Sequence, residues 1–281
     1  MRKLIEQLKN IELAIFDLDG VIYKGNKLIS DSDKVITSLK ELRVKVVYNS
    51  NNSTVTRQMY VDRLKGFNIE SEILDFYTSA SITASEITKV KQNAKIYVIG
   101  EIGLKEELKS CGHEVVNAES NHKVVDFVIV GLDRDLTYVK LAFAQRCILE
   151  GSAKFYATNA DASLPVATGL LPGAGVMVNA VETCTNQKPV KIFGKPNPEG
   201  IQSILEDTNS NPIRSVIFGD RLNTDILAGN RAGINTALVL TGVTKASDVE
   251  KLWGDKDCSP EAEIGMIPNI VINSLKEIFM P

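Results

Sequence analysis

The segment LAIFDLDGVI, residues 13–22, sets the expected fold of this chain. Its first four residues are apolar, which is typical of a short strand buried on both faces of a parallel sheet. Two carboxylates, Asp17 and Asp19, follow directly, and Gly20 permits a loop after them. Asp often ends a strand or caps a turn, so the pair indicates either a strand end or a site that uses the charges.

Apolar runs and helical segments alternate along the rest of the chain. Further runs typical of buried strands are 44–48, 96–99, 127–130, 154–157, 215–218 and 236–240. Helical spacing occurs in 31–42, 56–65, 104–111, 138–150, 198–208 and 224–232. This alternation predicts parallel β/α units and therefore an α/β fold with a Rossmann-like, doubly wound parallel sheet.

Polar clusters stand where predicted strands end or helices begin. They are DLDG (17–20), NSNNST (49–54), GKP (194–196) and GDRLNTD (219–225). A doubly wound sheet gathers its ligand groups beyond the carboxyl ends of its strands. We therefore expect the four clusters at one edge of one sheet.

Composition limits the class of partner. The chain has 281 residues, 44% of them hydrophobic and 24% charged, which is ordinary for a soluble globular protein. The net charge of −3 gives no sign of a surface for nucleic acid or anionic membrane. No apolar run approaches the roughly 18 residues of a membrane span. We expect a small-molecule partner, no nucleic acid and no membrane.

The cysteines and histidines do not form a metal pattern. The sequence has four cysteines and two histidines, without a CxxC pair: Cys111, Cys147, Cys184, Cys258, His113 and His122. A zinc site is not expected from this spacing. The first residues, MRKLIEQLKN, lack the apolar region of a secretory signal, which favours a cytoplasmic location with reduced thiols.

The four polar clusters, in this order, resemble the four motifs of haloacid dehalogenase (HAD) superfamily phosphatases. The middle of the chain is similar to the NagD-like, or 4-nitrophenylphosphatase, subfamily in GLDRDLTYVKL (131–141), ATNADASLP (157–165) and GLLPGAG (169–175). The resemblance extends over about residues 11–243. It implies a catalytic core of residues 1–80 and 189–281, with an inserted α/β cap of the C2 type at 81–188.

The resemblance also implies the roles of the acidic residues. Asp17 is expected to attack phosphorus as a nucleophile and form an aspartyl-phosphate, since a carboxylate is ionised at neutral pH. Asp19 is expected to act as general acid and then general base. The implied cofactor is Mg²⁺, with Asp17, the Asp19 carbonyl and Asp220 as ligands. Asp225 is expected behind these or bound through water, or else as a first-turn helix residue stabilised by the helix dipole.

The phosphate-binding residues are implied in the same way. Ser50 is expected to hold a phosphoryl oxygen, with its neighbours Asn51 and Asn52, near the start of a helix that favours anions. Many family members have Thr at this position, and Ser keeps the hydroxyl. N-capping by Ser53 or Thr54 is an alternative that is compatible with this role. Lys195 is expected to bind phosphate and shield it from the Asp17 carboxylate.

The inserted segment is too long for a loop and has its own β/α pattern, so we expect a separate lobe. Closing over the core would exclude water and supply substrate contacts. The loop 158–165 and the turn 172–175 are candidates for facing the substrate, and rigid surface turns are the alternative. Family members with this cap often dimerise through it, so a homodimer is a further expectation.

The function expected from the sequence is hydrolysis of small phosphomonoesters, of the sugar phosphate, phosphoglycolate or aryl phosphate type, by an Mg²⁺-dependent phosphatase. One alternative is a phosphotransferase or mutase that uses the same chemistry at Asp17. The other is a metabolite-binding protein without catalysis. Gly100 and Gly103 follow a predicted strand, but two glycines without GxGxxG are weak evidence for nucleotide binding.

Overall fold

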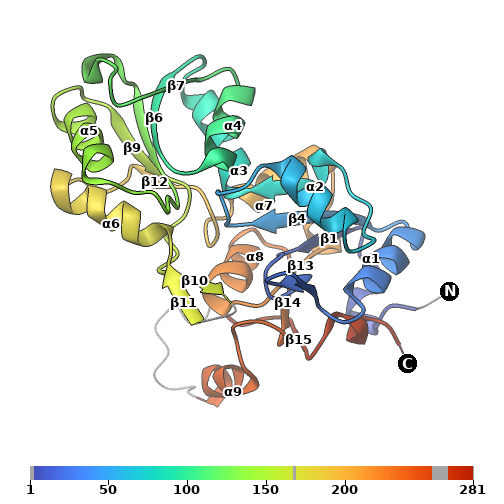
Figure 1. Cartoon of the computed structure of the whole chain (residues 1–281). Helices are drawn as coiled ribbons and strands as arrows, with labels where there is room; N and C mark the ends of the chain where they lie inside the picture. The colour runs from blue at the N-terminus through green and yellow to red at the C-terminus, as the bar shows by residue number, and fades with distance from the viewer. Residues whose placement is uncertain (1–2, 167–168, 255–264, 281) are drawn as a thin grey trace. The chain divides into compact units, whose positions relative to one another are not determined.

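The computed structural model describes residues 3–166, 169–254 and 265–280 (Figure 1). Cys258 lies outside these residues. The chain forms two compact units, each with its own sheet. The first unit comprises Met1–Ser50, Val61–Tyr77 and Lys195–Pro281, and the second comprises Asn51–Tyr60 and Thr78–Gly194. That the second unit serves as a cap stays a prediction.

The first unit is built on a six-stranded sheet in the order β15-β14-β13-β1-β4-β5. The strands are β1 (Leu13–Phe16), β4 (Lys45–Ser50), β5 (Phe76–Thr78), β13 (Ser215–Gly219), β14 (Asn235–Val239) and β15 (Ile270–Ile272). β1 pairs in parallel with β4 and β13, and β14 pairs in parallel with β13 and β15. After β1, the chain adds β4 and β5 on one side of it, and later adds β13, β14 and β15 on the other side. The expected doubly wound sheet is confirmed, and its direction of winding switches between β1 and β13.

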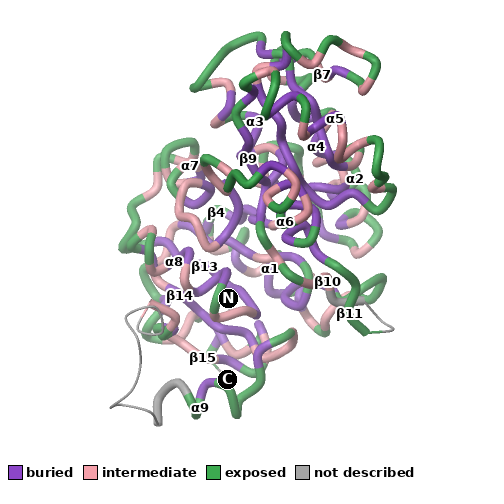
Figure 2. Tube along the Cα trace, turned by 90° about the vertical axis from the view of Figure 1, so that its left-hand side faces the viewer, coloured by how far each residue is buried: buried purple, intermediate pink, exposed green. Residues whose placement is uncertain are grey.

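Helices cover this sheet and bury its strands. They are α1 (Ser32–Glu41), α7 (Glu199–Thr208), α8 (Leu227–Arg231) and α9 (Ala246–Gly254). Helix α2 (Arg57–Lys65) begins in the second unit and continues into the first. All four residues of β1 are fully buried, as the tube in Figure 2 shows for the central strands. Leu13 and Ile15 pack against α7 and α8 through Ile201, Ile204 and Ala228. Burial on both faces explains why this strand reads as an uninterrupted apolar run.

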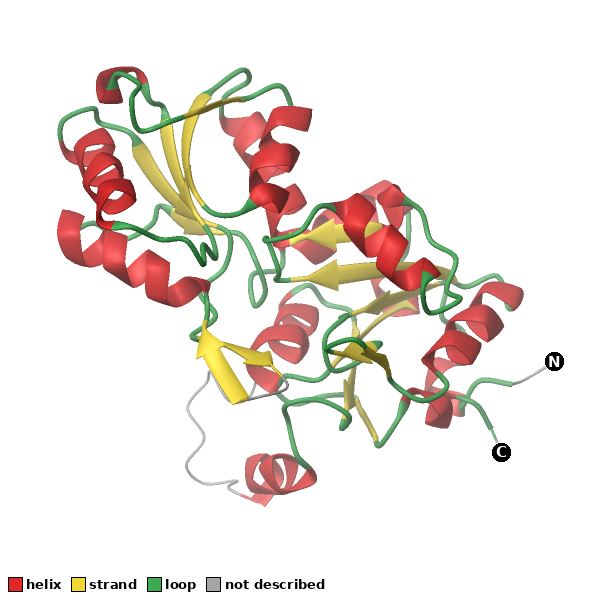
Figure 3. Ribbon diagram, viewed as in Figure 1, coloured by secondary structure: helices red, strands yellow, loops and turns green. Residues whose placement is uncertain are grey.

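The second unit has a five-stranded parallel sheet in the order β12-β9-β8-β6-β7. Its strands are β6 (Lys95–Ile99), β7 (Glu114–Val116), β8 (Phe127–Val130), β9 (Lys154–Ala157) and β12 (Lys191–Ile192). Helices α3 (Ser79–Val90) and α4 (Ile102–Ser110) lie on one side, and α5 (Tyr138–Leu149) and α6 (Ala174–Thr185) on the other (Figure 3). Its separate core includes Val128, Val130 and Phe143.

Several elements differ from the expectation. The expected loop 158–165 and turn 172–175 contribute to a hairpin, because β10 (Ser163–Val166) pairs antiparallel with β11 (Gly169–Pro172) and α6 begins at Ala174. The expected helix 224–232 is a π-helix, Leu222–Ile226, continued by α8. A second hairpin joins β2 (Tyr23–Lys24) to β3 (Lys27–Leu28).

Leu4 and Phe279, which are far apart in the sequence, form an antiparallel bridge in the first unit. Within the described residues, every helix is too short or too polar to cross a membrane.

Candidate active site

Asp17 stands at the switch point of the first sheet. Phe16 at the end of β1 is in register with Phe218 of β13, and their rings stack with centroids 4.8 Å apart. The Asp17 amide continues this pairing by donating to the Phe218 carbonyl at 2.9 Å. Asp17 therefore comes level with Gly219, and Asp220 follows β13 at the same edge.

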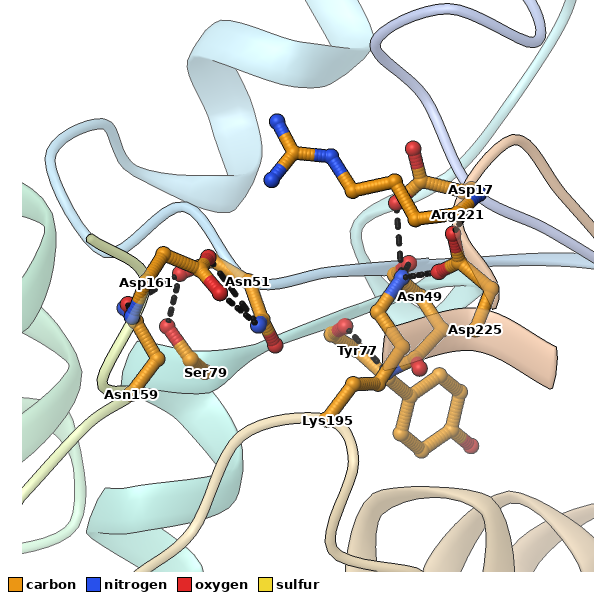
Figure 4. Close-up of polar contacts among 10 residues, drawn as sticks. All are labelled: Asp17, Asn49, Asn51, Tyr77, Ser79, Asn159, Asp161, Lys195, Arg221 and Asp225. Carbon is orange, nitrogen blue, oxygen red and sulfur yellow. Dashed lines mark hydrogen bonds and ion pairs between the residues drawn. The ribbon is translucent and has the colours of Figure 1, made fainter. Parts of the chain in front are cut away.

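Three carboxylates meet at this edge. Asp17, Asp220 and Asp225 each offer an oxygen within 4.8 Å of the others. The Lys195 ammonium lies 2.7 Å from Asp17 Oδ1 and 2.6 Å from Asp225 Oδ1 (Figure 4). Three carboxylates and one ammonium, if all are ionised, leave two negative charges in a site where the Asp220 and Asp225 residues are only 2% and 1% exposed. Oxygen donors with this excess charge fit a hard divalent cation such as Mg²⁺.

Burial opposes ionisation of the acidic residues. It raises the pKa of Asp17 well above its usual value of 3.8; Lys195 opposes this rise, while Asp225 and Asp220 add to it. Burial and Asp225 raise the pKa of Asp220 to about 6. Burial alone would lower the pKa of Lys195, but the attraction of Asp17 and Asp225 outweighs it, so this pKa is raised and the ammonium stays charged.

Two glycine-containing loops hold Asp220. Gly20 has a φ of +91°, and a Cβ there would lie 2.4 Å from Asp220 Oδ2. The Val243 amide donates to the same oxygen at 2.7 Å, and the Thr241 hydroxyl donates to the Gly20 carbonyl at 2.6 Å. The segment 241–243 was not predicted from the sequence to be part of the site. Its position directly after the predicted strand 236–240 was the available signal.

Asp225 lies at the start of a helix and also faces the acidic cluster, while its role towards a metal stays a prediction. It lies in the π-helix, and its Oδ2 accepts a hydrogen bond from the Arg221 amide at 3.1 Å. Its other oxygen pairs with Lys195. Gly219 makes room for it, since a Cβ there would lie 2.1 Å from Asp225 Cβ. Asp225 thus stabilises the start of a helix while facing the acidic cluster.

Lys195 also joins the site to β4. Its ammonium donates to the backbone carbonyl of Asn49 at 2.7 Å. The side-chain nitrogen of Asn49, Nδ2, donates to the Tyr77 carbonyl at 3.0 Å. Ser50 is the buried last residue of β4. No sequence signal pointed to the contact between Lys195 and Asn49, because it uses a backbone carbonyl and every residue carries one.

The structure places Asn51 and Asn52 in the second unit. The Asn51 amide nitrogen donates to both Asp161 carboxylate oxygens, at 3.1 and 3.3 Å. Asn52 Oδ1 accepts hydrogen bonds from the amide and the hydroxyl of Thr54, at 2.8 and 2.7 Å. Helix α2 begins at Arg57, and the Thr56 hydroxyl accepts from the Met59 amide at 3.3 Å. The expected capping by Ser53 or Thr54 is therefore wrong, because the helix starts later in the chain.

Asp19 is the exposed acid of the pair in DLDG. Partial desolvation raises its pKa, and the positive charges of Arg63, Arg221 and Lys195 oppose the rise. The Arg63 guanidinium lies 3.9 Å from the centre of the Tyr23 ring. Arg221 extends past Asp17 in Figure 4. Neither arginine was identified from the sequence.

Comparison with known proteins identifies the family. One family model, described as haloacid dehalogenase-like hydrolase, matches residues 14–114, and another, described as HAD-hydrolase-like, matches residues 192–278. The 5'-nucleotidase YutF of Bacillus subtilis is 34% identical over 248 residues, which cover 87% of this chain and 94% of the relative.

Solved structures have the same fold. The 4-nitrophenylphosphatase of Thermotoga maritima has a TM-score of 0.86 and 33% identity, covering 97% of each chain. The glycerol phosphate phosphatase of Mycobacterium tuberculosis, solved in complex with magnesium, has a TM-score of 0.85 and 26% identity, covering 100% of this chain and 79% of that one. The chain therefore belongs to the haloacid dehalogenase-like hydrolases, within the NagD-like group, and is a phosphatase.

Proposed function

We propose that this protein is an Mg²⁺-dependent phosphatase that hydrolyses small phosphomonoesters through an aspartyl-phosphate on Asp17. The observation that carries the proposal is the buried cluster of Asp17, Asp220 and Asp225 around Lys195. A purely structural site would gain stability by replacing such poorly solvated like charges with neutral groups. The arrangement instead supports charge-dependent chemistry.

In the proposed reaction, a carboxylate oxygen of Asp17 attacks phosphorus in line with the leaving group. The ester oxygen leaves as the bond to phosphorus breaks, and Asp19 donates a proton to it. A water molecule then attacks the aspartyl-phosphate and gives its proton to Asp19, which releases inorganic phosphate and restores Asp17. The exposure of Asp19 and its raised pKa support its alternation between these two protonation states.

Lys195 and Ser50 are proposed to hold the phosphoryl group. Lys195 provides a charge fixed by Asp17, Asp225 and the Asn49 carbonyl, so little reorganisation is needed as charge develops on the phosphoryl oxygens. The Ser50 hydroxyl and the backbone amides of Asn51 and Asn52 are proposed as further hydrogen-bond donors to these oxygens.

Asp17, the Asp19 carbonyl and Asp220 are proposed to hold Mg²⁺, with Asp225 behind them or bound through water. A bound divalent cation would offset the repulsion among the carboxylates and neutralise charge on the phosphoryl group. The magnesium in the Mycobacterium tuberculosis relative supports this choice of metal.

The proposed substrate is a small phosphorylated metabolite. The three relatives described above are named for a nucleotide, an aryl phosphate and glycerol phosphate, which share only the phosphomonoester group. We further propose that the second unit acts as the cap that selects the leaving group. Dimerisation through this unit, a cytoplasmic location and the absence of nucleic-acid and membrane partners remain parts of the proposal.

Asp17→Asn tests the mechanism with 4-nitrophenyl phosphate as the probe. We expect Mg²⁺-dependent turnover by the wild-type protein and a loss of at least about a thousandfold in the variant, because its nucleophile is gone. Asp33→Asn in α1 removes the same charge elsewhere in the first unit and serves as the control. Wild-type, Mg²⁺-dependent turnover by pure Asp17→Asn would contradict the mechanism.

The same assay separates the alternatives. A phosphatase releases one inorganic phosphate for each alcohol formed when no acceptor other than water is present. A mutase or phosphotransferase would release little phosphate under these conditions, and a binding protein would show no turnover. Activity that persists in EDTA would remove the proposed role of the acidic cluster in metal binding.

A further inference from the structure

Two of the residues proposed to bind phosphate each adjoin a bond at which the chain passes between the two units. The passages fall at residues 50–51, 60–61, 77–78 and 194–195. At the first, Ser50 of the first unit is bonded to Asn51 of the second. At the last, Gly194 of the second unit is bonded to Lys195 of the first. Anything that fixes Asn51 and Gly194 therefore acts one peptide bond away from Ser50 and Lys195.

Asn51 is held by polar contacts inside the second unit. Its carbonyl accepts a hydrogen bond from the Ser79 hydroxyl at 2.6 Å and another from the Asn159 amide nitrogen at 2.8 Å. Its own amide nitrogen donates to the Asp161 carboxylate (Figure 4). These three partners fix both the backbone and the side chain of Asn51.

Gly194 is held by the same segment of the second unit. Its amide donates to the Thr158 carbonyl at 2.7 Å. A Cβ at this position would lie 2.6 Å from that carbonyl oxygen and 2.7 Å from Asn51 Oδ1, so the close approach requires glycine.

The segment 158–161, which contacts both Asn51 and Gly194, is itself stabilised by a local hydrogen bond. The Asp161 amide donates to Asn159 Oδ1 at 3.1 Å, which closes a short turn over 159–161. Asn159 is buried, and Asp161 is partly exposed. This turn lies in ATNADASLP (157–165), part of which the sequence predicted only as a loop facing the substrate.

We propose that Asp161 and Asn159 are positioning residues for phosphate binding: they fix Asn51 and Gly194, and thereby the placement of Ser50 and Lys195. The inference rests on the proposed function of Ser50 and Lys195. In this arrangement the Asn51 side chain donates to the Asp161 carboxylate and does not bind phosphate. Loss of the Asp161 contact is expected to misplace the phosphate-binding groups, and a misplacement of about 1 Å is enough to slow catalysis about a hundredfold.

The effect has a signature that a substrate-contacting residue would not give. Ser50 and Lys195 are proposed to meet the phosphoryl group, which every substrate shares. Disturbing them therefore lowers kcat/KM by the same factor whatever the leaving group. A residue that touches the leaving group would change kcat/KM by different factors for different esters.

The experiment exchanges donor and acceptor across the Asn51 and Asp161 pair. Asn51→Asp places two carboxylates together, and Asp161→Ala removes the acceptor. The double variant Asn51→Asp/Asp161→Asn restores one carboxylate and one amide in reversed order. Asp126→Asn is the matched control, because Asp126 is a partly buried carboxylate of the second unit that accepts from Lys91 Nζ at 2.6 Å and the Lys95 amide at 2.9 Å.

We expect both single variants to lose about ten- to a hundredfold in kcat/KM. The loss should be equal for 4-nitrophenyl phosphate and glycerol phosphate, with recovery in the double variant and no loss in Asp126→Asn. A double variant as slow as Asn51→Asp, or losses that differ between the two esters, would overturn the inference. Unchanged kinetics in the single variants would do the same, while a wild-type protein inactive on both esters would instead reject the proposed function.

Discussion

At the scale of single residues, Asp220 is a carboxyl group whose buried surroundings favour its protonated, neutral form. Burial and Asp225 raise its pKa from 3.8 to about 6, and the Val243 amide only partly offsets this. A group whose pKa is higher in the folded than in the unfolded state binds protons more tightly when folded. Its contribution to stability is therefore complete below pH 3.8 and is lost as the pH rises through about 6.

Asp220→Asn should consequently stabilise the metal-free protein at pH 7.5. The amide carries no charge and keeps an oxygen that can accept from Val243, so we expect the free energy of unfolding in EDTA to rise on the order of 1–3 kcal/mol. Urea unfolding measures this change, and the gain should shrink at pH 4.5, where the wild-type carboxyl is protonated when folded. An equal gain at both values of pH would show that the charge is not its source.

Asp220→Asn should also separate stability from metal binding. Mg²⁺ stabilises a protein when it binds the folded state alone, so millimolar Mg²⁺ is expected to raise the Tm of the wild-type protein. The variant has lost a proposed ligand and should show little rise in Tm and little turnover. A rise in Tm equal to that of the wild type would remove Asp220 from the metal site.

At the scale of elements, the loops after β1, β13 and β14 form the acidic site together. The carboxylates of the first two loops were predictable, since a doubly wound sheet gathers groups at one edge. The loop 241–243 was missed because its contribution is a backbone amide and the space left by Gly242. A Cβ on Gly242 would lie 1.8 Å from Asp220 Oδ2, a restraint that becomes visible only in three dimensions.

Other elements could not be predicted from the sequence for local reasons. Helix α3 is rich in Ser, Thr and Ile, which are weak helix formers, and it is stabilised by a capping box between Thr78 and Ser81 and by buried Ile82 and Ile87. The β10–β11 hairpin contains Pro165 and Pro172, which favour turn predictions. The segment 222–226 has a helical pattern, which does not distinguish an α-helix from the wider turn of a π-helix.

Gly20→Ala tests how closely the first loop fits Asp220. Gly25→Ala is a matched control, because Gly25 also has a positive φ, +57°, but has nothing within 4 Å of its missing Cβ. Both variants should lose about 1 kcal/mol of stability from backbone strain, and Gly20→Ala should lose more because its Cβ also clashes with Asp220. Only Gly20→Ala should lose Mg²⁺-dependent turnover as well, by roughly tenfold or more, because its Cβ displaces the Asp220 carboxylate. Steady-state kinetics over a range of Mg²⁺ concentrations measures the difference, and equal activity of the two variants would contradict it.

At the scale of the whole molecule, the two units have separate cores, and we expect them to respond to acid in opposite directions. The acidic cluster lies in the first unit, whose metal-free form gains stability as Asp220 becomes protonated. The second unit buries His113, whose Nδ1 accepts from the Ala94 amide at 3.1 Å and whose Nε2 lies 2.9 Å from the Thr88 hydroxyl. Since Nδ1 accepts a hydrogen bond, the buried imidazole is neutral with its proton on Nε2.

Acid should therefore destabilise the second unit specifically. Desolvation lowers the pKa of His113 below its usual 6.5, despite a hydrogen bond to the Ala84 backbone, so below this pH the unfolded state takes up a proton that the folded state resists. The stabilisation is complete above pH 6.5 and falls by at most about 1.4 kcal/mol per pH unit towards the lowered pKa. Hydrogen exchange in EDTA at pH 7.5 and 5.5, corrected for intrinsic rates, should show lost protection in β6 and β8 but not in β1 and β13. His113→Asn keeps an acceptor for the Ala94 amide without a titrating group, so it should abolish that loss, and an equal loss in both units or in the variant would contradict the assignment.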